Sequence, residues 1–275
     1  MSGLISKIQR YSTKDGPGLR STVFAMGCPL RCAWCANPEL LEAKPTTFHY
    51  AERCVHCGAC KPYADMDQRA AACYYDAYEP VGVTLTAREL AEKLLRDKAF
   101  YDQSGGGVTY SGGEAALQAE FFLEVTQLLK KDSVHVALDT SGHVPWEALG
   151  PLVEAVDLVL FDIKAMDDEL HRRYTGVDNR LILENARRIA ALGKEVTVRL
   201  ILVPGVNDDE TEMQNRLEFV RDLGIAKVEF LKYHRLGAGK YRRLGLDEPM
   251  GDTPECSDAV LERAVGMAAQ MQLMR

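Results

Sequence analysis

The sequence has 275 residues, of which 47% are hydrophobic, so it can bury a sizeable core as one domain with a small appendage. Its formal net charge of -7 argues against a nucleic-acid partner, because surfaces that bind nucleic acids are normally basic. No apolar run approaches the length of a membrane span, and the first residues lack the apolar core of a signal peptide, so we expect a cytoplasmic protein with no membrane partner.

The first predicted strand, residues 22–25, leads into a loop with three closely spaced cysteines, Cys28, Cys32 and Cys35. Three thiolates can hold three irons of a 4Fe-4S cluster, and the fourth iron then keeps an open position for binding and activating a substrate. The alternatives are a zinc knuckle or a disulfide. Zinc usually requires a fourth ligand at a regular spacing, and disulfides require an oxidising compartment. The spacing therefore predicts an open catalytic cluster.

A second run of cysteines follows, and its spacing is similar to that of a ferredoxin: Cys54, Cys57 and Cys60. A ferredoxin would carry its fourth cysteine four positions later, but Ala64 stands there, and the next thiol is that of Cys73. One auxiliary 4Fe-4S cluster, held by Cys54, Cys57, Cys60 and Cys73, is the most economical assignment.

Two other assignments of this second site remain open. The same four cysteines could bind zinc, since four-cysteine zinc sites use similar spacing, or His56 or Asp76 could complete the site. Whichever group binds there, residues 44–80 show little apolar periodicity. We therefore expect residues 44–80 to form an insert in a domain built from residues 1–43 and 81–275.

In the rest of the chain, short β-branched or apolar runs alternate with helical patterns. Thr86 and Glu89 form a capping box that opens one of these helices. Six runs are predicted strands, namely residues 22–25, 108–111, 134–139, 158–164, 196–203 and 228–233. Such alternation predicts a parallel sheet with crossover helices, and six units are too few for a full eight-stranded barrel. The fold class is therefore α/β, a partial (β/α)6 TIM-type barrel with a small Fe-S cluster insert.

Polar residues stand at the predicted carboxyl ends of the strands, where such sheets carry their functional groups. In Ser111-Gly-Gly-Glu114, the glycines let a ligand approach the backbone, and the carboxylate can accept from an ammonium group. Asp162 and Lys164 share one face of their strand, and Arg199 lies in an apolar run where its charge needs a carboxylate. A turn, a helix cap or a structural ion pair is the alternative explanation for these motifs.

The cysteine spacing resembles that of the radical S-adenosylmethionine (SAM) enzymes. The segments Ile8–Arg20 and Trp34–Glu39 sharpen the match, because they are similar to those of activating enzymes of glycyl radical enzymes, such as pyruvate formate-lyase activating enzyme. The resemblance runs to about residue 245. One departure is Ala36, where the family more often has histidine, and it removes a hydrogen-bonding group near the cluster but no iron ligand.

The resemblance implies roles for the first strand-end motifs. Gly112, Gly113 and Glu114 match the segment that holds the methionine amino group of SAM. Asp139, followed by Thr140, matches an aspartate that helps to bind a monovalent cation, Na⁺ or K⁺, beside the SAM carboxylate. Both residues are therefore expected in the cofactor site.

It also implies roles for residues nearer the reacting groups. Asp162 and Lys164 match a pair that faces the active site, and Arg199 matches a residue that contacts the SAM carboxylate. Asp15, in a glycine-rich turn, is expected to close over the site. Two further matching residues flank the adenosyl group, namely Val203 and His234.

The function implied by the resemblance is that of a glycyl radical enzyme activating enzyme, an oxidoreductase active under anaerobic conditions. A reduced 4Fe-4S cluster would cleave SAM to methionine and a 5'-deoxyadenosyl radical, which abstracts a Cα hydrogen from a glycine of a partner enzyme. We expect flavodoxin or ferredoxin as electron donor and a monomeric state. Alternatives are a radical SAM enzyme acting on a small molecule or another peptide, or an electron-transfer protein, although the latter explains neither the open cysteine site nor the Gly-Gly-Glu motif.

Overall fold

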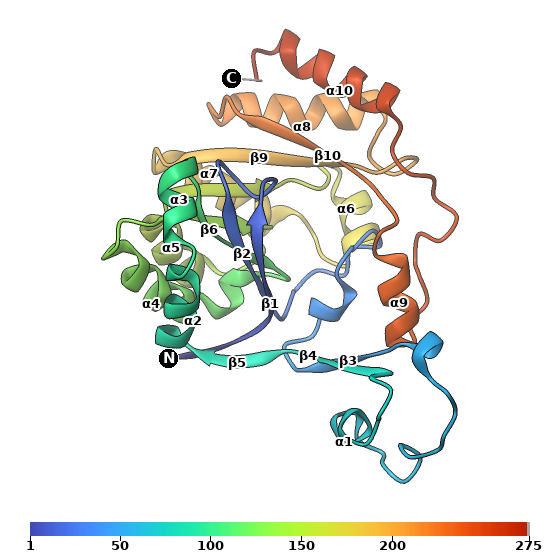
Figure 1. The fold of residues 1–275 in the computed structure, drawn as a ribbon. Coiled ribbons are helices and arrows are strands. Elements are labelled where there is room, and N and C mark those ends of the chain that lie inside the picture. Colours follow the sequence, from blue (N-terminus) through green and yellow to red (C-terminus); the bar gives the residue numbers. More distant parts are fainter. Residues whose placement is uncertain (274–275) are drawn as a thin grey trace.

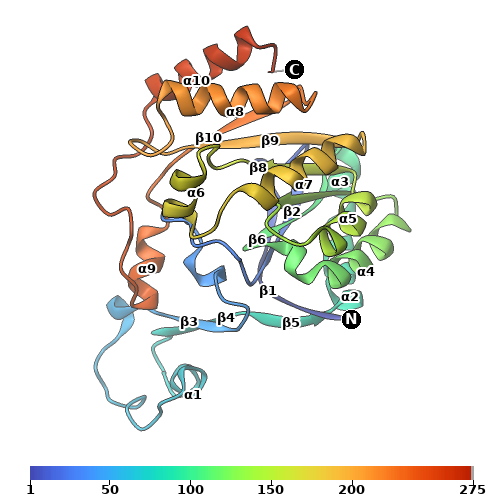
Figure 2. The same ribbon diagram turned by 180° about the vertical axis from the view of Figure 1, so that it is seen from behind.

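The centre of the molecule is an eight-stranded, mostly parallel sheet that curves into an open arc (Figure 1 and Figure 2). The structure is a computed structural model and describes residues 1–273. The strand order is β10-β9-β8-β7-β6-β2-β1-β5. The six parallel members are β2 (Arg20–Ala25), β6 (Gly107–Gly112), β7 (His135–Thr140), β8 (Leu158–Asp162), β9 (Glu195–Leu202) and β10 (Val228–Lys232). They coincide with the six predicted strands, and the predicted partial barrel is confirmed.

Two antiparallel strands that lie at one edge of the sheet are not predicted by the sequence analysis. β1 (Ser2–Ser12) pairs with β2, and β5 (Val83–Thr86) pairs in turn with β1. The second half of β1 is polar and largely exposed, so it shows no apolar alternation. This hairpin brings the glycine-rich turn between β1 and β2 back against the barrel.

Helices cover the outer face of the sheet, and the core lies between the two layers (Figure 2). The capping box is confirmed at the start of α2, where the Glu89 backbone N–H donates to Thr86 Oγ1 over 3.2 Å. No helix of residues 1–273 is long and apolar enough to cross a bilayer. The helices after β5 are α2 (Ala87–Leu95), α3 (Lys98–Ser104), α4 (Ala119–Lys130), α5 (Trp146–Ala155), α6 (Asp168–Thr175), α7 (Arg180–Ala191), α8 (Glu210–Asp222), α9 (Ala238–Leu244) and α10 (Asp258–Gln270).

The part of the chain from β3 (Thr46–His49) to β4 (Tyr78–Val81) protrudes from the barrel (Figure 1). Its base is the antiparallel pair of β3 and β4, and its tip carries α1 (Met66–Ala71). A small apolar cluster joins this base to the barrel, and its buried members are Met26, Leu40, Phe48, Tyr50 and Val81. Short 3-10 helices span Pro38–Leu40 and Ala51–Arg53 here, and a third spans Ala115–Gln118 after β6.

Candidate active site

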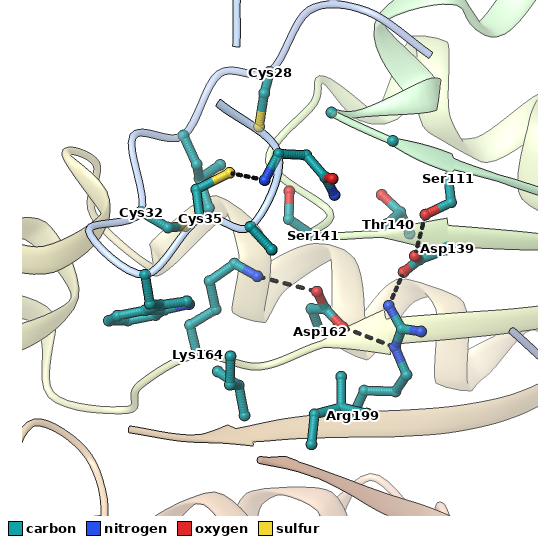
Figure 3. Close-up of a pocket in the computed structure, with 18 of the residues that line it drawn as sticks. Cys28, Cys32, Cys35, Ser111, Asp139, Thr140, Ser141, Asp162, Lys164 and Arg199 are labelled. Carbon is teal, nitrogen blue, oxygen red and sulfur yellow. Dashed lines mark hydrogen bonds and ion pairs between the residues drawn. The ribbon is translucent and has the colours of Figure 1, made fainter. Parts of the chain in front are cut away.

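A pocket of about 260 Å³ opens where the parallel strands end. The loop after β2 forms one wall, and the carboxyl ends of β6 to β10 form the other. Figure 3 shows the three cysteine side chains on the loop facing the polar side chains of the strand ends. The pocket therefore lies at the edge of the sheet that the sequence predicts for the functional groups.

Backbone hydrogen bonds from distant segments hold the cysteine loop in place. The N–H of Cys28 donates to Leu41 O over 3.1 Å, and the N–H of Arg31 donates to Thr175 O over 2.7 Å. Asn37 N–H donates to Cys35 Sγ over 3.4 Å. Cys28, Cys32 and Cys35 all line the pocket, and they are the only cysteines among its lining residues in the described chain.

Burial and a neighbouring cation have opposite effects on the pKa values of the three thiols. Burial raises the pKa of Cys28 to about 11 and that of Cys32 to about 12, and it also raises the pKa of Cys35. The ammonium of Lys164 acts in the other direction on all three pKa values, although burial is the larger effect. Because the thiolate is the form that binds iron, this cation favours the ligating state inside an otherwise apolar wall.

Opposite the thiols, two carboxylates and two cations form a buried chain of ion pairs (Figure 3). Lys164 Nζ lies 3.0 Å from Asp162 Oδ2, and Arg199 Nε lies 3.1 Å from Asp162 Oδ1. Arg199 Nη2 lies 2.5 Å from Asp139 Oδ1, and Ser111 Oγ donates to Asp139 Oδ2 over 2.5 Å. Arg199 therefore meets two carboxylates of the protein itself, whereas its predicted contact with the SAM carboxylate stays a prediction.

The two aspartates titrate differently because they meet different numbers of cations. Burial raises the pKa of Asp139 to about 6, because Arg199 is the one cation of the described residues that opposes it and the hydrogen bond from Ser111 adds only a smaller lowering effect. Burial also acts to raise the pKa of Asp162, but Lys164 and Arg199 together outweigh it and hold that pKa below the usual range. At neutral pH the four side chains carry balanced charges, so a ligand with both an ammonium and a carboxylate group meets complementary partners in one pocket.

The Gly-Gly-Glu motif is divided between the pocket and the core. Gly112 and Gly113 line the pocket, whereas Glu114 has no exposed surface and does not line it. Glu114 Oε1 accepts from Thr140 Oγ1 over 2.7 Å, and Glu114 Oε2 accepts from Ser141 N–H over 2.9 Å and from Ser141 Oγ over 2.6 Å. Both oxygens are thus occupied inside the protein, which differs from the expected contact with the SAM amino group.

Two other predicted residues lie outside the pocket lining. Val203 is fully buried and does not line the pocket, whereas Ile201 on β9 does. Asp15 Oδ2 accepts from Ser12 Oγ over 2.5 Å and from Thr22 Oγ1 over 2.7 Å, so this turn is tied to β1 and β2. In contrast, His234 is exposed and lines the pocket.

The pocket also contains residues that the sequence analysis did not single out. They are Leu30, Leu41, Ser141, Ile201, Leu231, Lys232 and Tyr233. Strand alternation could have indicated Ile201, because it lies two positions from Arg199 and shares its face. Trp34 and Asn37 also line the pocket, and both lie in the segment Trp34–Glu39 that carries the resemblance.

The cysteines of the insert line a cavity of their own, of about 300 Å³. All four, Cys54, Cys57, Cys60 and Cys73, contribute to its wall, as does His56, whereas Asp76 does not. Cys73 Sγ accepts from Ala77 N–H over 3.4 Å. No three His, Cys, Asp or Glu side chains of residues 1–273 gather closely enough to share one metal ion. A cluster makes no such demand, because its ligands bind different irons.

Comparison with known proteins places these features in context. The Radical SAM superfamily model matches residues 22–217. The chain is 38% identical to the pyruvate formate-lyase 2-activating enzyme of Escherichia coli, over 93% of this chain and 85% of that protein. It is 36% identical to the choline trimethylamine-lyase activating enzyme of Oleidesulfovibrio alaskensis, over 94% of this chain and 93% of that protein.

Solved structures agree in fold. A domain of a pyruvate-formate lyase-activating enzyme from Bacteroides vulgatus superposes with a TM-score of 0.53 at 27% identity, over 62% of this chain and 96% of that one. A radical SAM methyltransferase from Sphaerobacter thermophilus superposes with a TM-score of 0.58 at 15% identity, over 98% of this chain and 75% of that one. The second similarity concerns the fold alone.

Proposed function

Because this chain belongs to the radical SAM superfamily, and within it to the activating enzymes of glycyl radical enzymes, we propose that Cys28, Cys32 and Cys35 bind its catalytic 4Fe-4S cluster. The chain is an enzyme that uses SAM to generate a radical, and that radical abstracts a glycine hydrogen from a partner glycyl radical enzyme. When bound, the reduced cluster supplies the electron that cleaves SAM into methionine and the 5'-deoxyadenosyl radical.

The observation that carries this proposal is the composition of the pocket. Three thiols face it from one loop, and no fourth cysteine of the described chain joins them, so one iron of a bound 4Fe-4S cluster would keep an open position. Lys164 stabilises the thiolate form of these ligands. Trp34 and Ile201 give the pocket an apolar side.

Arg199 and Lys164 are proposed to bind and orient SAM. A guanidinium has five N–H donors, and the two carboxylates take only two of those of Arg199, through Nε and Nη2. The remaining donors can hold the SAM carboxylate. Lys164 likewise uses one of its three donors on Asp162. Asp162 therefore positions both cations, and the backbone at Gly112 and Gly113 supplies the acceptor side for the amino group.

The proposed monovalent cation belongs beside Asp139 and Thr140. Both Asp139 oxygens already accept a hydrogen bond, but each has a second lone pair for a cation. For Asp15, Val203 and Glu114 we propose supporting roles, because none of them lines the pocket. His234, which lines the pocket, is proposed to flank the adenosyl group.

We propose that residues 44–80 form a separate insert and that Cys54, Cys57, Cys60 and Cys73 hold one auxiliary 4Fe-4S cluster. Support comes from the shared cavity, which all four thiols line. Iron and sulfide analysis separates this cluster from a zinc site. A flavodoxin or ferredoxin donor, a monomeric state and a cytoplasmic location are proposed from the family resemblance alone.

Substitution of a single ligand tests the catalytic assignment. Cys32→Ala should abolish 5'-deoxyadenosine formation from SAM under anaerobic, dithionite-reduced conditions, because a cluster with two protein ligands is not retained in an open form. The auxiliary iron should remain. Cys256→Ala is the matched control, since Cys256 is buried far along the chain and should leave both cleavage and iron content unchanged.

Chromatography of the nucleoside products and iron analysis provide the measurements. Cleavage by Cys32→Ala at the wild-type rate would show that the catalytic cluster lies elsewhere. Electron paramagnetic resonance after mixing the wild-type protein with candidate glycyl radical enzymes then identifies the partner, which is the one that acquires a stable glycyl radical.

A further inference from the structure

We propose that Lys240, on α9, is a positioning residue that orients the side-chain amide of Asn37 so that its NH₂ group is presented to bound SAM. The inference rests on the proposed function of the pocket as the SAM site. Lys240 lies 203 residues after Asn37 in the sequence, so no local pattern connects the two. The contacts, the packing of α9 and the burial of a neighbouring carboxylate each support the assignment.

The contacts define which way the amide faces. Lys240 Nζ lies 2.6 Å from Asn37 Oδ1 and 2.5 Å from Glu39 Oε1. An ammonium only donates, so it selects the oxygen of the amide and turns Nδ2 away from itself. Asn37 lines the pocket, and Nδ2 has no hydrogen-bond partner within residues 1–273. The NH₂ group is therefore the polar group of Asn37 that is left for a ligand.

Asn37 is held at two points. Its backbone N–H donates to Cys35 Sγ over 3.4 Å, while its side-chain oxygen is bound by Lys240. With the first contact on a proposed iron ligand and the second on α9, the residue has little freedom to turn. A donor fixed next to the cluster can meet a nitrogen or oxygen acceptor of the SAM molecule that binds the open iron.

The start of α9 packs against the same turn. A Cβ built on Gly237 would lie 3.0 Å from Ala36 Cα and 3.1 Å from Cys35 O, so any other residue would require the turn to shift by a few tenths of an ångström. The backbone contact brings Lys240 to the turn. α9 also lies beside the base of the insert, next to β3 (Figure 1).

Glu39 provides the competing explanation, in which Lys240 does no more than neutralise a buried charge. Glu39 is 5% exposed, and its second oxygen is buried without a hydrogen-bond partner in the described chain. A carboxylate in that position is costly unless a cation stays next to it. Charge neutralisation alone would not require the contact with Asn37, and the two roles can be separated by substitution.

The first experiment compares Lys240→Met with Arg242→Met. Arg242 is exposed on the same helix, so its substitution removes the same charge without touching the turn. Isothermal titration under anaerobic conditions should show SAM binding weakened about three- to tenfold in Lys240→Met, the effect of one hydrogen bond, and unchanged in Arg242→Met. Iron content should equal that of the wild type in both.

Variants of Glu39 and Asn37 distinguish orientation of the amide from neutralisation of the buried charge. Glu39→Gln combined with Lys240→Met removes the buried charge and protects folding, and SAM binding should stay weak, whereas Glu39→Gln alone should bind normally. In an Asn37→Ala background, Lys240→Met should add no further loss.

Wild-type affinity in the double variant would overturn the proposal in favour of charge neutralisation. An equal loss with and without Asn37 would also overturn it. A wild-type protein that fails to bind SAM would instead contradict the proposed function of the pocket, and that result is separate from the comparison between variants.

Discussion

At the residue scale, Glu114 shows how a motif residue can act through its neighbours. It has no exposed surface, and its two oxygens bind the hydroxyls of Thr140 and Ser141 and the Ser141 backbone. Thr140 and Ser141 both line the pocket. The carboxylate therefore shapes the loop after β7, and the two glycines before it form the part of the motif that lines the pocket.

Glu114→Gln should destabilise this loop, because the amide NH₂ would face donors on Ser141 and leave buried groups unpaired. We expect a loss of about 1–3 kcal/mol in the free energy of unfolding, and weaker SAM binding as a secondary effect. Thermal unfolding and titration with SAM measure the two quantities. Ser111→Ala, whose hydroxyl binds Asp139 instead, is the comparison. If Glu114→Gln had normal stability but much weaker SAM binding, that result would instead support a direct contact between Glu114 and the SAM amino group.

At the scale of elements, the end of β6 is glycine because two strands and a loop meet there. Gly112 pairs with Ala25 of β2, has a φ of +111°, and a Cβ built on it would lie 2.3 Å from the Ala25 nitrogen. A Cβ built on Gly113 would lie 2.2 Å from Gly27 O. The glycines thus allow backbone to pack on backbone directly below the cysteine loop, in addition to facing the pocket.

Gly112→Ala should therefore destabilise the protein far more than a positive φ alone would. Gly105 is the matched control, because it has a φ of +67° and no atom near its Cβ position. Gly105→Ala should cost about 1–2 kcal/mol, the cost of a left-handed φ for a residue with a Cβ, and Gly112→Ala should cost about 1–3 kcal/mol more from overpacking. Chemical denaturation of the metal-free proteins compares them. If both variants lost the same free energy of unfolding, β2 would have to shift without cost, and the overpacking argument would be wrong.

At the scale of the whole molecule, the insert is a lobe attached to the barrel through a small apolar base and α9 (Figure 2). Its cysteines line their own cavity and contribute nothing to the wall of the catalytic pocket. The proposed auxiliary cluster can therefore serve electron transfer or partner docking without supplying a group to SAM cleavage.

Cys73→Ala should lose iron from the auxiliary site or convert it towards a three-iron cluster, yet retain SAM cleavage with a strong chemical reductant. Asp76→Asn is the matched control for the alternative ligand, because asparagine tolerates its φ of +50°. Spectroscopy of the clusters and product analysis give the measurements. An unaltered auxiliary signal in Cys73→Ala would exclude this ligand, and complete loss of cleavage in a folded protein would make the cluster part of the chemistry.

The features that could be predicted from the sequence are those that depend on short separations along the chain. The spacing of Cys28, Cys32 and Cys35 predicts an open cluster, the apolar runs predict the six parallel strands, and Thr86 with Glu89 predicts the start of α2. Each depends on a local rule, either ligand spacing, periodicity or capping.

Other features were decided only by tertiary structure. Three features depend on how distant segments pack. Glu114 is buried, Ile201 lines the pocket whereas Val203 does not, and Lys240 contacts Asn37. β1 lacked apolar alternation because one half of it is exposed at the sheet edge. Local patterns specify which elements form, whereas the side chains that reach a common pocket are determined by the close packing of elements far apart in the sequence.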